Sequence, residues 1–296
     1  MTQKINLLLI LTFLISGISS AQESNIRKYT PSKLLKKGQN DIKWYNNFYS
    51  QTKKKENGIL FDIPRENYYT STFEYFRGVS ENSRFNIGVV LNLKSTTIGK
   101  SWFSPIEFKN EQGVFRAGFS SITPSISFQP IEHIGNFSIR TGVTIPLIAH
   151  ETEYGVYLDK KSYVWETKFF YDYTFPSGDF QIFTELDTQF NFGEADTYDN
   201  NTTSEGGFSN NSLGVPVSVF FSYFPTNDFT VFVQAQQYVL IDLGNDFSQE
   251  FTQLGLGMKY QVLKTLNLET SYTNFIRGSD TGLGETLNLG LRYISN

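Results

Sequence analysis

Alternation of apolar and polar residues is the feature that most constrains this chain. In residues 85–94 every odd-numbered residue is apolar, and the even-numbered residues, except Val90, are polar or glycine. Successive side chains of a strand point to opposite sides, so this pattern predicts a β-strand with unlike faces. A Ser/Asn-containing break at 80–84 separates it from a second run that begins at Tyr68, which predicts a hairpin. The same unit recurs to the end of the chain.

The connections between these runs alternate in length. Short ones are expected at 80–84, 131–136, 176–179, 226–228 and 264–265, and longer ones at 53–67, 95–113, 149–162, 193–210, 242–250 and 277–284. Outer-membrane barrels have this asymmetry, with short turns on the periplasmic side. The pattern predicts an all-β fold, a single closed antiparallel transmembrane β-barrel of about 12 strands, within a range of roughly 10–14. An even strand number places both termini on the short-turn, periplasmic side.

The apolar face is expected to point outward. A barrel of about eight strands encloses a space that side chains can fill, and the width grows with strand number. About twelve strands around an apolar lumen would leave a void that protein packing does not tolerate. Two packed soluble sheets remain the alternative. Aromatic residues at the starts of the strands after the short turns favour the membrane barrel, because aromatic girdles flank its apolar band.

Local breaks in the pattern carry further expectations. Residues 114–129 switch face in the middle, which predicts a β-bulge near Ser120 and Ser121. Pro124, Pro146 and Pro216 lie inside candidate strands and are expected at bulges or strand ends, because proline cannot donate to the ladder.

The N-terminus predicts export. Lys4, an apolar run at 5–15 and the small residues before Gln22 are typical of a secretory signal peptide. The expected organisation is a cleaved signal peptide at 1–21, a periplasmic N-terminal tail at 22–37 and the barrel at 38–296, located in the outer membrane. The tail is basic and is interpreted as solvated, with a short plug inside the barrel as the alternative.

The polar face predicts a charged lumen. The residues expected to line it are Glu74, Lys94, Arg140, Glu166, Lys168, Asp172, Glu185, Asp187, Lys259, Glu269 and Arg292. Five are basic and six are acidic, and such a mixed set pairs across strands more often than it selects one ion sign. Gly88, Gly142, Gly255, Gly257 and Gly290 share this face and are expected to leave room for water or long charged side chains.

One hairpin predicts a specific register. If the turn at 176–179 places Phe175 opposite Phe180, Lys168 lies opposite Asp187 on the inner face, with Glu185 one diagonal step away. A slip by one residue would mix the faces, so the register should be strongly specified.

Little in the chain predicts catalysis. There are two histidines, His133 and His150, and no spacing typical of a hydrolase places either beside a nucleophile. The absence of cysteine removes thiolate metal sites. Acidic residues at 193–210 could hold Ca²⁺ through oxygen ligands, but their spacing does not repeat. We expect no enzyme activity, no metal and no cofactor, and a net charge of −4 does not favour a nucleic-acid partner.

The closing strand, with Asn288, Gly290, Leu291 and Tyr293, resembles the last strand of Gram-negative outer-membrane β-barrels. The chain ends three residues after Tyr293, whereas the family ends on an aromatic residue. The stretch LLKKGQNDIKWYNNFYSQT is similar to small transporter-like, porin-like barrels of Bacteroidota. The resemblance implies outer-membrane lipid, lipopolysaccharide and the barrel-assembly machinery as partners.

Three functions follow as hypotheses. The first is a passive channel or facilitator for small polar or amphipathic solutes. The second is a structural or surface-interaction barrel with a closed lumen. The third is a barrel lipase or protease, which the missing nucleophile–histidine spacing disfavours.

Overall fold

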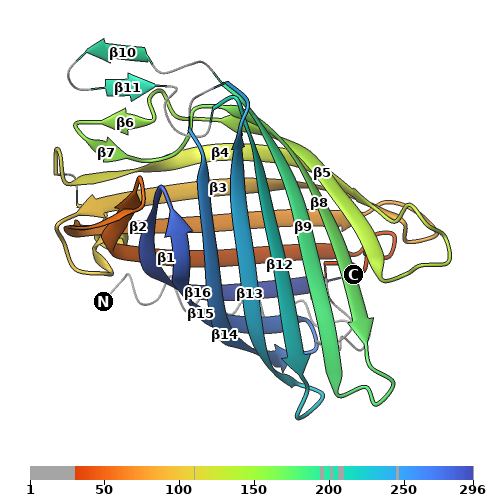
Figure 1. Cartoon of the computed structure of the whole chain (residues 1–296). Helices are drawn as coiled ribbons and strands as arrows, with labels where there is room; N and C mark the ends of the chain where they lie inside the picture. The colour runs from red at the N-terminus through yellow and green to blue at the C-terminus, as the bar shows by residue number, and fades with distance from the viewer. Residues whose placement is uncertain are drawn as a thin grey trace, which may run out of the picture.

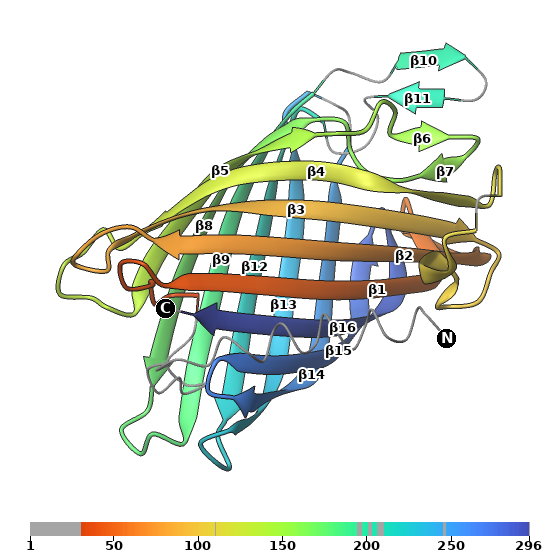
Figure 2. The same ribbon diagram turned by 180° about the vertical axis from the view of Figure 1, so that it is seen from behind.

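Twelve antiparallel strands form a closed barrel, in which β1 pairs with β16 (Figures 1 and 2). This computed structural model describes residues 31–109, 111–193, 197–200, 203–205, 210–244 and 247–295. The barrel strands are β1 (Asn40–Glu56), β2 (Ile59–Gly78), β3 (Phe85–Ile98), β4 (Phe115–Phe128), β5 (Phe137–Pro146), β8 (Tyr163–Thr174), β9 (Phe180–Phe192), β12 (Ser212–Tyr223), β13 (Phe229–Asp242), β14 (Gln249–Leu263), β15 (Leu266–Ser279) and β16 (Thr281–Ser295). The predicted fold class and strand number are confirmed. The expected signal peptide lies outside the described residues.

A smaller sheet lies beyond the long-loop end of the barrel (Figure 1). It contains β6 (Thr152–Glu153), β7 (Val156–Tyr157), β10 (Thr197–Asn200) and β11 (Thr203–Glu205). A single 3-10 turn, η2 (Ser104–Glu107), is the helical element of the described ranges. No helix in the described part of the chain is long and apolar enough to cross a membrane.

The strand starts and the register agree with the sequence. Strands β3, β5, β9, β13 and β15 begin at Phe85, Phe137, Phe180, Phe229 and Leu266, as the turn pattern predicts. Lys168 of β8 lies opposite Asp187 of β9, and Trp165 lies opposite Phe190. The predicted register of this hairpin is confirmed.

Two connections differ from the expectation. Residues 53–67 were expected to form a polar connection, but β1 and β2 continue through them and turn at Asn57 and Gly58. Both turn residues have positive φ, 48° and 79°, which is the Asn-Gly conformation that closes a two-residue hairpin. Similarly, β15 and β16 extend into the connection expected at 277–284 and leave only Asp280 between them. Their mutual pairing ends at Asn274 and Glu285, and beyond it β15 pairs with β14 and β16 pairs with β1. The strands remain paired here through backbone hydrogen bonds, which do not require a regular alternation of apolar and polar side chains.

The predicted bulge is confirmed and the proline expectation is confirmed in part. Asn92 pairs with Ser121 and Leu93 pairs with Phe119, so Ser120 is the extra residue. Pro146 ends β5. Pro124, however, lies within β4 and has no paired residue on β5, and Pro216 lies within β12 and has no paired residue on β9. The register continues past both, so the missing N–H leaves a gap in one ladder and no bulge.

Large apolar side chains cover the outside of the barrel. Each barrel strand exposes at least one, as shown by Trp44, Phe73, Ile87, Ile126, Val143, Trp165, Leu186, Val219, Val233, Leu256, Leu268 and Leu289. Val233 and Leu256 are 57% and 61% exposed. Buried polar residues, including Lys43, Asp41 and Asp187, lie inside. This arrangement reverses the usual inside and outside of a water-soluble protein.

The segment just before β1 packs into the short-turn end of the barrel. Ser32 and Leu35 are 0% and 3% exposed. Ser32 donates a hydrogen bond to Asp172 of β8, and the Leu35 amide donates to Asn86 of β3 at 3.2 Å. The part of the expected solvated tail that the structure describes, residues 31–37, is therefore attached to the barrel wall, as in the plug alternative. The rest of the tail lies outside the described residues.

Candidate functional site: a divided lumen

The interior of the barrel contains two cavities in series, each of about 270 Å³. The first, the loop-side chamber, is lined by residues that include Thr72, Asn92, Lys94, Thr123 and Gln189. The second, the turn-side chamber, reaches Pro31 of the N-terminal segment. Glu74, Arg140 and Lys168 line both chambers, so these three side chains form the division between them.

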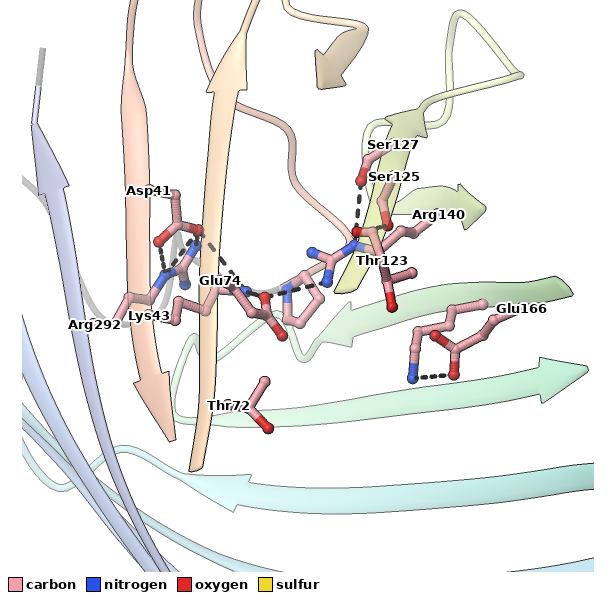
Figure 3. Close-up of polar contacts among 12 residues, drawn as sticks. Asp41, Lys43, Thr72, Glu74, Thr123, Ser125, Ser127, Arg140, Glu166 and Arg292 are labelled. Atoms are coloured by element: carbon pink, nitrogen blue, oxygen red, sulfur yellow. Dashed lines mark hydrogen bonds and ion pairs between the residues drawn. The ribbon is translucent and has the colours of Figure 1, made fainter. Parts of the chain in front are cut away.

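Glu74 is the centre of the dividing layer. Its Oε2 accepts hydrogen bonds from Lys43 Nζ at 3.1 Å and from Arg140 at 3.2 Å (Figure 3). Glu74 belongs to β2 and Arg140 to β5, with β3 and β4 between them in the wall. A contact between strands that are not neighbours crosses the interior. This ion pair therefore narrows the lumen.

Lys168 forms the second part of the layer. Its Nζ lies 2.8 Å from Asp187, 3.2 Å from Glu166 and 3.4 Å from Glu185. The predicted charge contact between Lys168 and Asp187 is confirmed. Gln189 donates to Glu166 at 2.9 Å, as their opposed positions predict. Three carboxylates around one ammonium hold its side chain in a fixed position.

The other residues that the sequence assigns to the lumen have partners within or beside it. Arg292 binds Asp41 through two nitrogens, at 3.0 and 2.7 Å. Lys259 lies 3.1 Å from Glu269. Asp172 is 2% exposed and accepts from Ser32 and from Gln181. Arg292 and Lys259 thus form ion pairs across strands, as expected from the balanced charges, and Asp172 binds polar side chains.

The connection between β7 and β8 also reaches the lumen. Asp159 and Lys160 line the loop-side chamber although neither belongs to a barrel strand. Lys94 of β3 donates to Asp159 at 2.7 Å, and Lys160 donates to Asn191 of β9 at 2.6 Å. Sequence reasoning placed this segment in a long loop and had no signal that it folds inward.

Aromatic side chains form part of the inner wall, and sequence reasoning did not predict this. Phe170, Phe183, Phe220 and Phe232 lie on β8, β9, β12 and β13 and line the turn-side chamber. Successive ring centroids are 6.1, 5.7 and 5.9 Å apart. We call this set the aromatic arc. The available signal was an apolar residue at a polar-face position, such as Phe183 between Gln181 and Glu185.

Two lumen glycines make room for rings. A Cβ at Gly88 would lie 2.4 Å from the Phe76 ring, and one at Gly257 would lie 2.3 Å from the Phe232 ring. The guanidinium of Arg140 lies 4.1 Å from the centroid of Phe76, and Lys259 Nζ lies 5.5 Å from that of Phe232. The space beside these glycines is therefore occupied by aromatic rings, whereas the sequence predicted water or long charged side chains there. The same rings contact the cationic side chains of Arg140 and Lys259.

A third cavity, of about 920 Å³, opens at the long-loop end. Its wall includes Tyr49, Tyr68, Phe251 and Phe275, together with Glu66. The Tyr49 and Phe275 ring centroids are 5.1 Å apart, and Tyr68 donates to Glu66 at 2.8 Å. The cavity forms a vestibule outside the two chambers.

The two histidines considered for catalysis lie apart from each other in the described structure. His133 lies in the turn between β4 and β5, and His150 lies beyond β5. Arg116 donates to the backbone oxygen of His150. Among the described residues, no three His, Asp or Glu side chains are grouped closely enough to hold a metal ion. The acidic side chains of 193–210 lie outside the described part of the chain.

The fold defines the class of this protein as a closed antiparallel barrel with an apolar exterior and a polar interior. No protein-family model matches the chain, and no curated protein matches it. Among solved structures, it is similar to an outer membrane channel from Pseudomonas putida F1, with a TM-score of 0.70 and 10% identity over 90% of this chain and 99% of that one.

A second solved structure has a lower similarity. The beta domain of the Bordetella autotransporter Brka matches with a TM-score of 0.54 and 12% identity, covering 86% of this chain and 98% of that one. At these identities the comparisons show the fold alone. The predicted resemblance to outer-membrane β-barrels is confirmed at that level.

Proposed function

We propose that this protein is an outer-membrane channel through which small polar or amphipathic solutes pass passively. The observation that carries the proposal is the pair of chambers in series inside a barrel whose exterior is apolar. A lipid-facing apolar band and a polar interior are the features of transmembrane barrels. The fold similarity to an outer membrane channel supports the same function.

The proposed orientation places the short turns, the segment 31–37 and both termini in the periplasm. Short periplasmic turns and longer external loops are the rule in such barrels. The vestibule then faces the cell exterior, and lipid and lipopolysaccharide are the surrounding partners. The barrel-assembly machinery is the proposed partner during insertion, because of the last strand. Bacteroidota-type barrels are the proposed group, because of the stretch that begins at Leu34.

A solute on the proposed permeation pathway has to pass the dividing layer between the two chambers. Glu74 compensates two cations, Lys43 and Arg140. Replacing Glu74 by Gln would leave an excess of positive charge in the dividing layer, and rings of charge of one sign select ions. We expect the Glu74→Gln channel to be more anion-selective than the wild type.

Single-channel recording of the purified protein in KCl tests the proposal. The expected result is stepwise conductance in the wild type and a shift of the reversal potential toward that of chloride in Glu74→Gln. Glu81→Gln is the matched control, because Glu81 lies in the turn between β2 and β3 and pairs there with Lys37. Wild-type protein that is folded but gives no current would contradict the channel.

A closed structural barrel is the second candidate, favoured by the segment 31–37. This segment contacts β3 and β8 from inside the short-turn end. A silent wild type that conducts after Ser32→Ala and Leu35→Ala would support this candidate. We propose no catalytic activity.

A further inference from the structure

We propose that the turn-side chamber selects small solutes that combine a flat aromatic ring with a dipolar, net-neutral polar group. This inference rests on the proposed channel function and names its solute class. It follows from three properties of the chamber: the aromatic arc, the charged residues that line the rest of the wall and the edges of the arc, and the pairing of every one of these charges.

The aromatic arc forms one side of the chamber. Phe183 and Phe220 lie directly opposite each other in the ladder between β9 and β12, and Phe170 and Phe232 extend the row on both sides. Phe170 and Phe232 are 3% and 4% exposed, whereas Phe183 and Phe220 are partly exposed. The two central rings are therefore the ones that a solute inside the chamber can contact.

The opposite side carries charges from β1, β2, β15 and β16. Lys43, Glu74, Glu269 and Arg292 line the same chamber as the aromatic arc. Ionic groups also lie beside the aromatic arc, since Lys168 and Glu185 share β8 and β9 with two of its rings. A solute in the chamber consequently meets aromatic faces and ionic groups at the same time. Aromatic rings interact favourably with aromatic faces in offset or edge-to-face geometry, which favours a flat ring on that side.

The charge of the solute follows from the ion pairs. The charged residues of the chamber are Lys43, Glu74, Arg140, Lys168, Glu185, Lys259, Glu269 and Arg292. Every one has an opposite charge within 3.4 Å, as in Lys259–Glu269 at 3.1 Å and Arg292–Asp41 at 2.7 Å. A singly charged solute would have to separate such a pair and leave one member uncompensated, which is costly where the pair is largely buried, as in Lys43–Glu74, whose side chains are 7% and 16% exposed. A dipolar group can bond to both members.

The size of the chamber limits the solute to a small molecule. Its volume is about 270 Å³, just below the range of roughly 300–1,000 Å³ for ligand pockets. A single ring with a short polar substituent is compatible with this space. L-Phenylalanine, a zwitterion with one ring, is a suitable probe for the class.

Proteoliposome swelling with matched solutes tests the inference. The probes are L-phenylalanine, L-glutamine as a zwitterion without a ring, phenylacetate as an anion with a ring, and phenyltrimethylammonium as a cation with a ring. For the wild type we expect L-phenylalanine to enter roughly threefold or more faster than L-glutamine, from one aromatic contact. It should also enter faster than either singly charged probe, with protein-free liposomes as the background.

The variant Phe183→Ser/Phe220→Ser removes the two central rings. We expect the ratio of phenylalanine to glutamine entry to fall to near one, whereas the KCl conductance is retained. Phe221→Leu is the control, because Phe221 follows Phe220 on β12 but is exposed on the outer face. If the double variant does not fold, Phe183→Leu and Phe220→Leu, which keep the volume apolar, should lower the ratio singly.

The outcomes separate the inference from the function on which it rests. A conducting wild type that shows no preference for phenylalanine, or a preference that survives loss of both rings, would overturn the inference and leave the channel intact. Faster entry of phenylacetate or phenyltrimethylammonium would overturn the dipolar assignment. A folded wild type without KCl conductance would overturn the channel function, and the inference would fail with it.

Discussion

The two sides of the turn-side chamber are built from the same alternating strands but are held together differently. The charged side depends on partners that are far apart in sequence, such as Glu74 with Arg140 and Arg292 with Asp41. The aromatic arc depends on contacts between rings on neighbouring strands, such as Phe183 with Phe220. Alternation determines which way a side chain faces, whereas the properties of the wall depend on which residues occupy the inward positions.

The ion pairs of the dividing layer should be more sensitive to a single change than the aromatic arc. Lys168→Met removes the one cation shared by Glu166, Glu185 and Asp187, and breaking a buried ion pair by removing one partner costs about 3–5 kcal/mol. We expect a loss of that size in the free energy of unfolding, measured by urea titration in detergent. Lys109→Met, which removes an exposed ion pair with Glu107 outside the barrel strands, should cause no measurable change. Equal results for both variants would show that the inner cluster is solvated.

The next largest effect is expected from variants that test which side chains of a strand face lipid and which face the lumen. Leu91 pairs with Phe73 and Ile122 on the outer face, whereas Asn92 donates to Ser121 on the inner face. Arg at a lipid-facing position near the membrane midplane costs about 2–4 kcal/mol. Leu91→Arg should therefore destabilise the folded barrel by up to that amount, and Asn92→Arg by much less. The check is the temperature at which each variant loses its heat-modifiable gel mobility, and similar losses at both positions would contradict the facing.

The aromatic arc should tolerate conservative change. Phe232→Leu keeps an apolar side chain of similar bulk over Gly257, and such swaps usually cost less than about 1.5 kcal/mol. The same urea titration should place this variant closer to the wild type than Lys168→Met. A larger loss for Phe232→Leu would mean that the arc, and not the ion pairs, stabilises the chamber.

The strands and their register could be predicted because they depend on local patterns. The turn at 176–179 sets Lys168 of β8 opposite Asp187 of β9, and alternation excludes a one-residue slip, which would place Lys168 opposite Leu186. The Asn57-Gly58 turn was also available as a local signal, but the neighbouring lysines were interpreted as a connection.

The organisation of the lumen could not be predicted because it depends on distant contacts. The contact between Glu74 and Arg140 requires knowledge of the barrel's curvature. The inward positions of Asp159 and Ser32 depend on segments outside the strands, where no periodicity applies. The sequence contains one weak indication of the aromatic arc, the apolar Phe183 at a polar-face position. The contact between Phe183 and Phe220, however, depends on the pairing of β9 with β12.

Labelling of single cysteines at two neighbouring positions tests directly whether a water-accessible pathway runs inside the barrel. The chain has no cysteine, so Thr72→Cys and Phe73→Cys each introduce a single thiol. Thr72 lines the loop-side chamber, and Phe73 is 44% exposed on the outer face. A water-soluble cationic methanethiosulfonate added during single-channel recording should reduce the current of Thr72→Cys in one irreversible step and leave that of Phe73→Cys unchanged. Two results would contradict a conducting pathway inside the barrel. One is a block of the current through Phe73→Cys, and the other is an unaffected current through Thr72→Cys after its thiol is shown to have reacted.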